Sequence, residues 1–313
     1  IRSPTSCSNL ERDSVMLSRR LVSLDYRLPD GVRLEDLRPS APRVEEATQL
    51  LSRLGMRTVL DRLPKGNASG CRVDIIDTPE SLDQLVDELS ACGELAVDTE
   101  TDSPNPMEAR PVGLALAREG DSAWYLPLRG EGALPRDRAV EALRTVFSGC
   151  SMVAQNAKYD MHVLRGMGLD WRTVGGDPFL ADYLLRPGGS RRSLAALSRL
   201  YLGRDMDTYD QVLDGAGTLL EVPLEKVSAY CCADVTTALL LHRKLSGMLA
   251  EAPELEKIYR RVELPLVEVL TDMERRGVSL DLESLGQLRG EYSARLAELT
   301  EEAAGIAGRT INL

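Results

Sequence analysis

Residues 94–128 read ELAVDTETDSPNPMEARPVGLALAREGDSAWYLPL and contain three apolar segments joined by short connections. Glu94 to Thr99, Val112 to Ala117 and Ala123 to Leu128 are rich in residues that favour strands, and Gly, Pro, Asp and Ser residues separate them. Three consecutive strands with short connections are typical of an antiparallel meander. This stretch therefore predicts the centre of a β-sheet.

The segments on either side of this meander alternate between strand and helix patterns. Arg72 to Ile76 predicts a strand, and the following Thr78-Pro79-Glu80-Ser81 predicts a helix start, since it offers a capping side chain and a first-turn proline. The pattern then predicts a helix at Arg136 to Phe147, a strand at Met152 to Gln155, a helix from about Tyr159 and a mainly helical remainder to Ala250. We therefore expect an α/β domain with a mixed five-stranded sheet.

Helical segments flank this domain on both sides. Residues 1 to about 60 are charged and helix-periodic, with apolar residues at helical spacing between Val44 and Leu60. Lys65 to Gly70 has the composition of a flexible linker, and Pro253 to Leu313 is amphipathic helix with an interruption at Arg276-Gly277-Val278. We expect three parts: a helical region with its linker at 1–65, the α/β domain at 66–252 and a second helical region at 253–313.

Composition and charge exclude several classes of protein. The 313 residues are 43% hydrophobic and 28% charged, which excludes a collagen, a coiled-coil rod and a wholly disordered chain. A net charge of −11 excludes a basic nucleic-acid coat, although it leaves room for a local basic patch. Neither a membrane-helix run nor a signal-peptide pattern is present.

The 6 cysteines lack CxxC spacing, so we expect a reducing cytoplasm rather than a zinc site or disulfides. Because the first residue is Ile rather than Met, we expect an excerpt of a longer protein.

Two carboxylates follow the apolar strand segment Leu95-Ala96-Val97. Strand side chains alternate, so Asp98 and Glu100 project from one face, where like charges repel unless a cation lies between them. Oxygen ligands favour a hard ion such as Mg²⁺ or Mn²⁺. Taken alone, this motif is more typical of a solvated strand end entering a turn.

Two further elements carry carboxylates at positions that suit a site. Asn156-Ala157-Lys158-Tyr159-Asp160 directly follows a strand, which is a usual location for functional residues in α/β folds, although Asn156 or Asp160 could instead cap the helix. In Tyr230-Cys231-Cys232-Ala233-Asp234 the i, i+4 spacing places Tyr230 and Asp234 on one helix face. The alternative there is a core tyrosine with a surface acid. The conjunction of all three elements, in this order, favours a site.

These three elements resemble the Exo I, Exo II and Exo III motifs of the DEDDy 3′–5′ exonucleases, which have an RNase H-like fold. Further stretches are similar to the proofreading domain of bacterial DNA polymerase I (family A) and its flanks: Asp98 to Ser103 with Val112-Gly113-Leu114, Glu263-Leu264-Pro265-Leu266 with Met273 to Val278, and Asn9 to Leu60. The last two are similar to the start of the polymerase domain and to the last helical part of the 5′ nuclease region. The resemblance covers nearly the whole chain.

The resemblance implies a proofreading exonuclease that hydrolyses the terminal phosphodiester of DNA with two divalent ions, Mg²⁺ or Mn²⁺, within a polymerase of DNA replication and repair. The implied catalytic residues are Asp98, Glu100, Asp160, Tyr230 and Asp234, of which the four acids ligate metal, and the implied DNA contacts are Thr99, Asn156 and Lys158. Asp98 would bridge both ions, and Glu100 and Asp234 would complete the first. Asp160 would support the second through water, while Tyr230 orients the attacking water.

The same resemblance implies the partners and the setting of the protein. We expect a single-stranded DNA 3′ end or a frayed primer terminus as substrate and a nucleoside monophosphate as product. We also expect a monomer in the bacterial cytoplasm, associated with the nucleoid and not with a membrane. His162 and His242 have no implied role, and Lys158 could equally be a plain surface lysine.

Several positions depart from the family pattern. Pro104 stands where a leucine usually contacts the terminal base, and Gly215-Ala216-Gly217-Thr218 stands where the family has a lysine-bearing loop. We therefore expect a weak grip on single-stranded DNA, unless Arg191 and Arg192 lie beside the groove and restore it. The third motif also allows a shifted register with Ser228 and Cys232 in the catalytic slots. The unshifted register is preferred because it places the flanking residues correctly.

Two other functions remain as alternatives. The first is an inactive exonuclease fold that serves as a spacer in a family A polymerase, which the presence of all four carboxylates argues against. The second is an RNA-trimming exonuclease of the RNase D type, which the polymerase-like flanks disfavour.

Overall fold

The computed structural model describes residues 9–23, 33, 43–54, 56, 59, 62–63, 71–90, 92–188 and 192–309. The chain divides into two units, Ile1–Arg43 and Val44–Leu313. The first contains helix α1 (Asn9–Val22), and the second contains every other element. The predicted linker at Lys65 to Gly70 lies outside the described residues.

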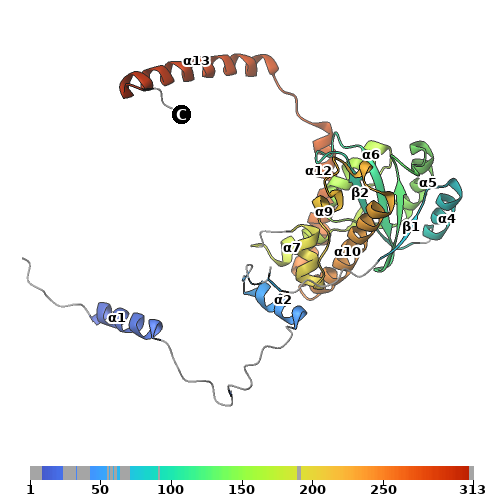
Figure 1. Ribbon diagram of the computed structural model, residues 1–313, viewed down its shortest axis with the longest axis horizontal. Coiled ribbons are helices and arrows are strands. Elements are labelled where there is room, and N and C mark those ends of the chain that lie inside the picture. The colour runs from blue at the N-terminus through green and yellow to red at the C-terminus, as the bar shows by residue number, and fades with distance from the viewer. Residues whose placement is uncertain are drawn as a thin grey trace, which may run out of the picture. The chain divides into compact units, whose positions relative to one another are not determined.

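A six-stranded mixed sheet forms the centre of the second unit (Figure 1), in the order β1-β4-β3-β2-β5-β6. The strands are β1 (Arg72–Ile75), β2 (Glu94–Thr101), β3 (Pro111–Ala117), β4 (Ser122–Pro127), β5 (Ser151–Val153) and β6 (Val174–Gly176). β2, β3 and β4 pair antiparallel, whereas the β1–β4, β2–β5 and β5–β6 pairs are parallel. The predicted meander is confirmed.

The sixth strand corrects the predicted count of five. β6 has only 3 residues, two of them glycines, so it carries neither the length nor the alternation by which a strand is predicted. Its pairing with β5 is a tertiary contact, with Met152 opposite Val174 and Val153 opposite Gly176. Close packing requires a glycine at position 176, because a Cβ there would lie 2.1 Å from the His242 ring.

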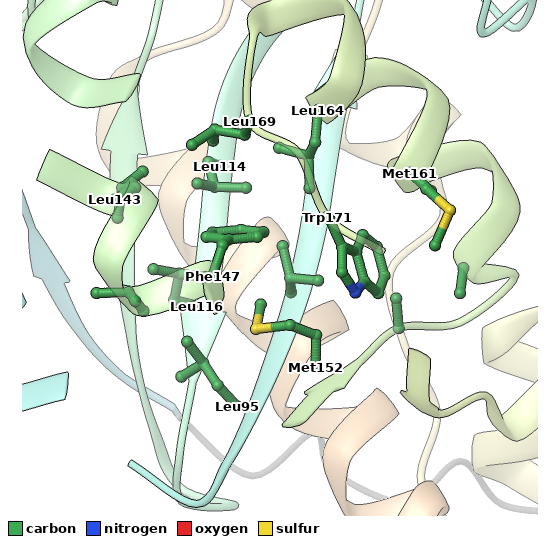
Figure 2. Close-up of a cluster of buried hydrophobic side chains, with 14 of the residues drawn as sticks. Leu95, Leu114, Leu116, Leu143, Phe147, Met152, Met161, Leu164, Leu169 and Trp171 are labelled. Carbon is green, nitrogen blue, oxygen red and sulfur yellow. The ribbon is translucent and has the colours of Figure 1, made fainter. Parts of the chain in front are cut away.

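Helices α4 (Pro79–Leu89), α5 (Arg136–Gly149) and α6 (Ala157–Met167) pack on one face of the sheet. Figure 2 shows this core, in which Leu143 and Phe147 of α5 and Leu164 of α6 meet sheet residues such as Leu95 and Leu116. The α4 start confirms the predicted cap, since Thr78 and Ser81 form a capping box. α6 begins two residues before the predicted start.

Helix α10 (Leu224–Ala250) covers the other face of the sheet. Its residues Cys231 and Val235 pack in a second core cluster with Ala96 of β2 and Ala115 of β3. Successive residues of β2 therefore alternate between the two cores, with Leu95 and Val97 in one cluster and Ala96 in the other. This alternation sets the direction of the acidic residues that follow.

The remaining elements of the second unit are short helical segments and two helices near the C-terminal end. They are α2 (Val44–Arg53), α7 (Pro178–Leu185), α8 (Leu194–Leu197), η2 (Ser198–Leu202), α9 (Tyr209–Leu213), η3 (Leu219–Glu221), α11 (Pro253–Ile258), η4 (Tyr259–Glu263), α12 (Leu264–Arg276) and α13 (Leu282–Ala307). The predicted interruption is confirmed, because α12 ends at Arg276 and Gly277 has a positive φ of 67°. None of the helices in the described ranges combines the length and apolar character that crossing a membrane requires.

Candidate active site at the end of strand β2

The end of β2 supplies the first two acidic residues of the site. Asp98 and Glu100 lie two and four residues after Ala96 on the strand, so their side chains project toward the same face of the sheet, which α10 covers. Thr99 shares the opposite face with Leu95 and Val97 and is buried there, with 7% of its surface exposed. The strand end therefore offers functional groups to both sides of the sheet.

Helix α10 brings the third acidic residue to this point. Carboxylate oxygens of Asp98, Glu100 and Asp234 all lie within 4.8 Å of one another. Tyr230, one turn earlier on α10, makes a side-chain hydrogen bond with Asp234. In the shifted register, Ser228 and Cys232 would stand here, but both are fully buried at 1% and 0% exposure. The structure therefore favours the unshifted register.

Asp160 approaches from the opposite side of the sheet, on α6. Its Oδ1 accepts hydrogen bonds from the Thr99 backbone N–H at 3.0 Å and from the Thr99 hydroxyl at 2.6 Å. Among the residues that the structure describes, none donates a hydrogen bond to Oδ2. Asp160 is not one of the three mutually close acids, but its pKa is raised in part by the charge of Asp98. It thus lies beside the cluster as a fourth carboxylate, with one oxygen fixed and the other available.

Burial raises the pKa of every acid in this site, and the charge of Asp98 raises the pKa values of the other three further. Burial raises the pKa of Asp98 from 3.8 to about 6. Burial, followed by the charge of Asp98, raises the pKa of Glu100 from 4.5 to about 8. Burial and the same neighbouring charge also raise the pKa values of Asp234 and Asp160. Carboxylates in this state are poorly compensated by the protein itself, which is the electrostatic condition of a cation site.

The donor set fits a hard divalent cation. The three clustered ligand atoms are all carboxylate oxygens, as Mg²⁺ and Mn²⁺ prefer. Cys231 lies close enough to make a side-chain hydrogen bond with Glu100, but burial beside these acids holds its thiol pKa well above the ordinary value. The thiol is therefore kept protonated, and the site offers oxygen rather than sulfur ligands.

The residues implied as DNA contacts have distinct environments. Thr99 uses its hydroxyl on Asp160. Asn156 is exposed in the left-handed conformation, with φ 60°, and its side chain does not cap α6. Lys158 forms an ion pair with Glu274 of α12, with 2.5 Å between Nζ and Oε1. Their roles toward DNA stay predictions.

The sequence left capping by Asn156 or Asp160 as an alternative, but the cap of α6 comes from Asp177. Its carboxylate accepts hydrogen bonds from the backbone N–H groups of Asn156 and Ala157 at the start of α6. Asp177 also caps its own helix α7 by accepting from Phe179 N–H at 2.8 Å. The Asp-Pro start of α7 is a local capping signal, but nothing local indicates that Asp177 reaches α6.

The sequence analysis offered two arginines, Arg191 and Arg192, as residues that could restore DNA binding. Arg191 lies outside the described residues. Arg192 lies 3.0 Å from the Asp182 carboxylate, stacks 5.2 Å from the centre of the Tyr183 ring and donates to the Arg186 carbonyl oxygen. It is thus engaged in an internal network.

A family model described as 3′–5′ exonuclease matches residues 73–250, which include all four acids and the whole sheet except its first residue, Arg72. The chain belongs to the 3′–5′ exonuclease family. A DNA polymerase I of Chloroflexus aurantiacus is 34% identical over 251 residues, which cover 77% of this chain and 26% of that protein. A DNA polymerase I of Pseudomonas aeruginosa is 28% identical over 328 residues, which cover 96% of this chain and 36% of that protein. The recognition of a DNA polymerase I-type exonuclease from sequence is confirmed, and this exonuclease chain spans only part of the length of those relatives.

The chain is also similar to solved structures. The POL domain of Pol1 from M. smegmatis, in complex with DNA primer-template and dNTP, is 25% identical with a TM-score of 0.63, covering 77% of this chain and 38% of that one. The catalytic core of RRP6 from Trypanosoma brucei is 20% identical with a TM-score of 0.51, covering 66% of this chain and 54% of that one. The second likeness shows the fold alone.

Proposed function

We propose that this chain removes nucleotides from the 3′ end of DNA by hydrolysis that depends on divalent cations. The observation that carries the proposal is the group of Asp98, Glu100 and Asp234, whose carboxylate oxygens lie within 4.8 Å of one another at the end of β2. Three partly buried acids with raised pKa values repel one another and gain stability when a cation binds between them. Two bound ions would activate the attacking water and stabilise charge on the leaving 3′ oxygen.

Each acid has a proposed part in this site. Asp98, Glu100 and Asp234 would hold the first ion, which Asp98 shares with the second. Asp160 would support the second ion through its free Oδ2, by way of water. Burial and the neighbouring acid charges raise the pKa of Tyr230 far above its ordinary value, so its phenol stays protonated at neutral pH and can position the attacking water.

The substrate proposed is a single-stranded DNA 3′ end, and the product is a nucleoside monophosphate. The DNA polymerase I relatives and the Pol1 structure with DNA primer-template support DNA over RNA as the substrate. We further propose a monomeric, nucleoid-associated part of a longer bacterial polymerase with domain borders near 65 and 252. Thr99, Asn156 and Lys158 are kept as proposed DNA contacts.

The test is degradation of 5′-labelled single strands of DNA and RNA of the same sequence, with Mg²⁺, with Mn²⁺ and with excess EDTA. We expect DNA to be shortened from its 3′ end in either metal and to stay intact in EDTA. Undiminished cleavage in EDTA would refute metal dependence. Preferential cleavage of RNA would indicate the RNase D-type alternative, and no cleavage of either strand would indicate an inactive spacer.

A further inference from the structure

The start of α6 is held by a residue from another part of the chain. The first N–H groups of a helix have no partner within the helix. At α6 the carboxylate of Asp177 accepts two of them, from Asn156 to Oδ1 at 3.1 Å and from Ala157 to Oδ2 at 2.9 Å. Asp160 follows less than one turn later. The orientation of Asp160 therefore depends on where Asp177 holds this turn.

Asp177 is itself fixed by a buried tyrosine. The Tyr259 hydroxyl accepts a hydrogen bond from Asp177 N–H at 2.7 Å and lies 3.2 Å from the Asp177 carbonyl oxygen, to which it donates. Tyr259 is 1% exposed and belongs to η4. It lies after residue 250, where the match to the exonuclease family model ends.

Helix α12, also beyond residue 250, holds the outer side of α6. Glu274 contacts Lys158 Nζ at 2.5 Å and His162 Nε2 at 2.8 Å. Arg165, with only 8% of its side chain exposed, pairs with Asp272 at 2.5 Å. Helix α6 is thus tied to the segment 259–276 both at its first turn and along its length.

We propose that Asp177 is a positioning residue of the exonuclease site and that Tyr259 sets its place. Together they hold the first turn of α6 so that one oxygen of Asp160 meets Thr99 and the other faces the metal site. This inference rests on the proposed function, because it assigns Asp160 to the second of two metal sites. It also extends the working exonuclease unit beyond the matched residues 73–250.

The test measures Mn²⁺ binding to the full chain by electron paramagnetic resonance, without any DNA. Loss of a partner that orients a metal ligand costs 10–100-fold in affinity, so we expect Asp177→Asn to weaken the second Mn²⁺ site by about that factor. Tyr259→Phe removes one buried hydroxyl and should weaken it by roughly 2–10-fold. Hydrogen exchange of the Asn156 and Ala157 amides should accelerate in both variants.

Tyr201→Phe is the matched control. The Tyr201 hydroxyl also donates to a buried aspartate of α7, reaching Asp182 Oδ1 at 2.7 Å, but Asp182 pairs with Arg186 and not with α6. We expect Tyr201→Phe to lower the melting temperature while the Mn²⁺ affinity of the folded protein is unchanged. A purely structural role of Tyr259 would give the same result as this control.

A double-mutant comparison identifies the route of the effect. If Tyr259 acts through Asp160, Tyr259→Phe has no further effect on Mn²⁺ binding in the Asp160→Asn background. Three results would overturn the inference. Tyr259→Phe could bind Mn²⁺ as the wild type does, or it could lower Mn²⁺ affinity as much in the Asp160→Asn background as in the wild type. The wild type could also have a single Mn²⁺ site whose affinity Asp160→Asn does not change. Should Asp177→Asn fail to fold, Tyr259→Phe alone decides. A wild type that binds two Mn²⁺ ions but leaves DNA intact would remove the proposed function and not this inference.

Discussion

Replacing Asp98 by asparagine should stabilise the metal-free protein while it abolishes exonuclease activity. The rise of the Asp98 pKa from 3.8 to about 6 means that its ionised form is disfavoured in the folded state. Converted at 1.36 kcal/mol per pKa unit, the rise corresponds to roughly 3 kcal/mol at a pH above both values. Because the side chain is only partly buried, we expect a gain of about 1–3 kcal/mol, or roughly 3–9 °C in melting temperature.

The sign of this effect depends on pH and on metal. Above about pH 6 the wild type carries the ionised, repelling acid and Asp98→Asn does not, so the variant should melt higher in EDTA. Near about pH 4 the acid is protonated in the folded protein, so the gain should largely disappear. With Mg²⁺ present the wild type gains binding free energy that the variant has lost, so the difference should shrink or reverse.

The assay is thermal unfolding followed by circular dichroism, in EDTA and in Mg²⁺, at both pH values. Asp182→Asn is the control, because Asp182 is a buried acid whose charge is compensated by Arg186 and by the hydroxyl of Tyr201. Its substitution should destabilise the protein by roughly 3 kcal/mol. If Asp98→Asn also melted lower than the wild type in EDTA at high pH, Asp98 would be a structural acid and the argument from its raised pKa would be wrong.

Three further outcomes are expected. Between about pH 5 and about pH 8 the metal-free wild type should lose stability as pH rises, because the folded pKa values of Asp98 and Glu100 are raised to about 6 and about 8. A melting temperature in EDTA that is flat or rises over this range would contradict this. Tyr230→Phe should lower the cleavage rate by roughly 100-fold or more without changing Mn²⁺ binding, and a parallel loss of Mn²⁺ affinity would mean that the phenol supports the ligands instead. Binding of a short single strand of DNA in Ca²⁺ should depend only weakly on salt, because each phosphate contact missing from the loop at Gly215 to Thr218 lowers the log–log slope by about 0.7. Arg192 is engaged in an internal network and is not expected to replace these contacts. A slope as steep as that of a lysine-bearing relative would show that other cations of the chain bind the phosphates.

The parts of the site that follow local periodicity could be predicted from the sequence. Alternation along β2 places Asp98 and Glu100 on one face, and the i, i+4 spacing on α10 places Tyr230 beside Asp234. Both relations span only a few residues, so backbone geometry alone fixes them. The meander was predictable for the same reason, since each of its strands carries its own apolar pattern.

The parts that depend on distant residues could not be predicted in this way. β6 has too few residues for a periodic signal. The cap of α6 comes from 20 and 21 residues away, Tyr259 reaches Asp177 across 82 residues, and Lys158 finds Glu274 across 116. The residues next to such an aspartate or tyrosine in the sequence do not indicate which distant group it will contact.

The sequence by itself determined that Asp98 lies on the same face as Glu100 and Tyr230 on the same face as Asp234, because strand and helix periods are properties of the local backbone. It also determined the family, since the three motifs occur in the same order and spacing. Only the tertiary structure decided how Asp160 is held, with Thr99 on one side of the sheet and Asp177 at the start of α6. The physical reason is that buried N–H groups must find acceptors, and the acceptor is chosen by which segments pack together rather than by their distance along the chain.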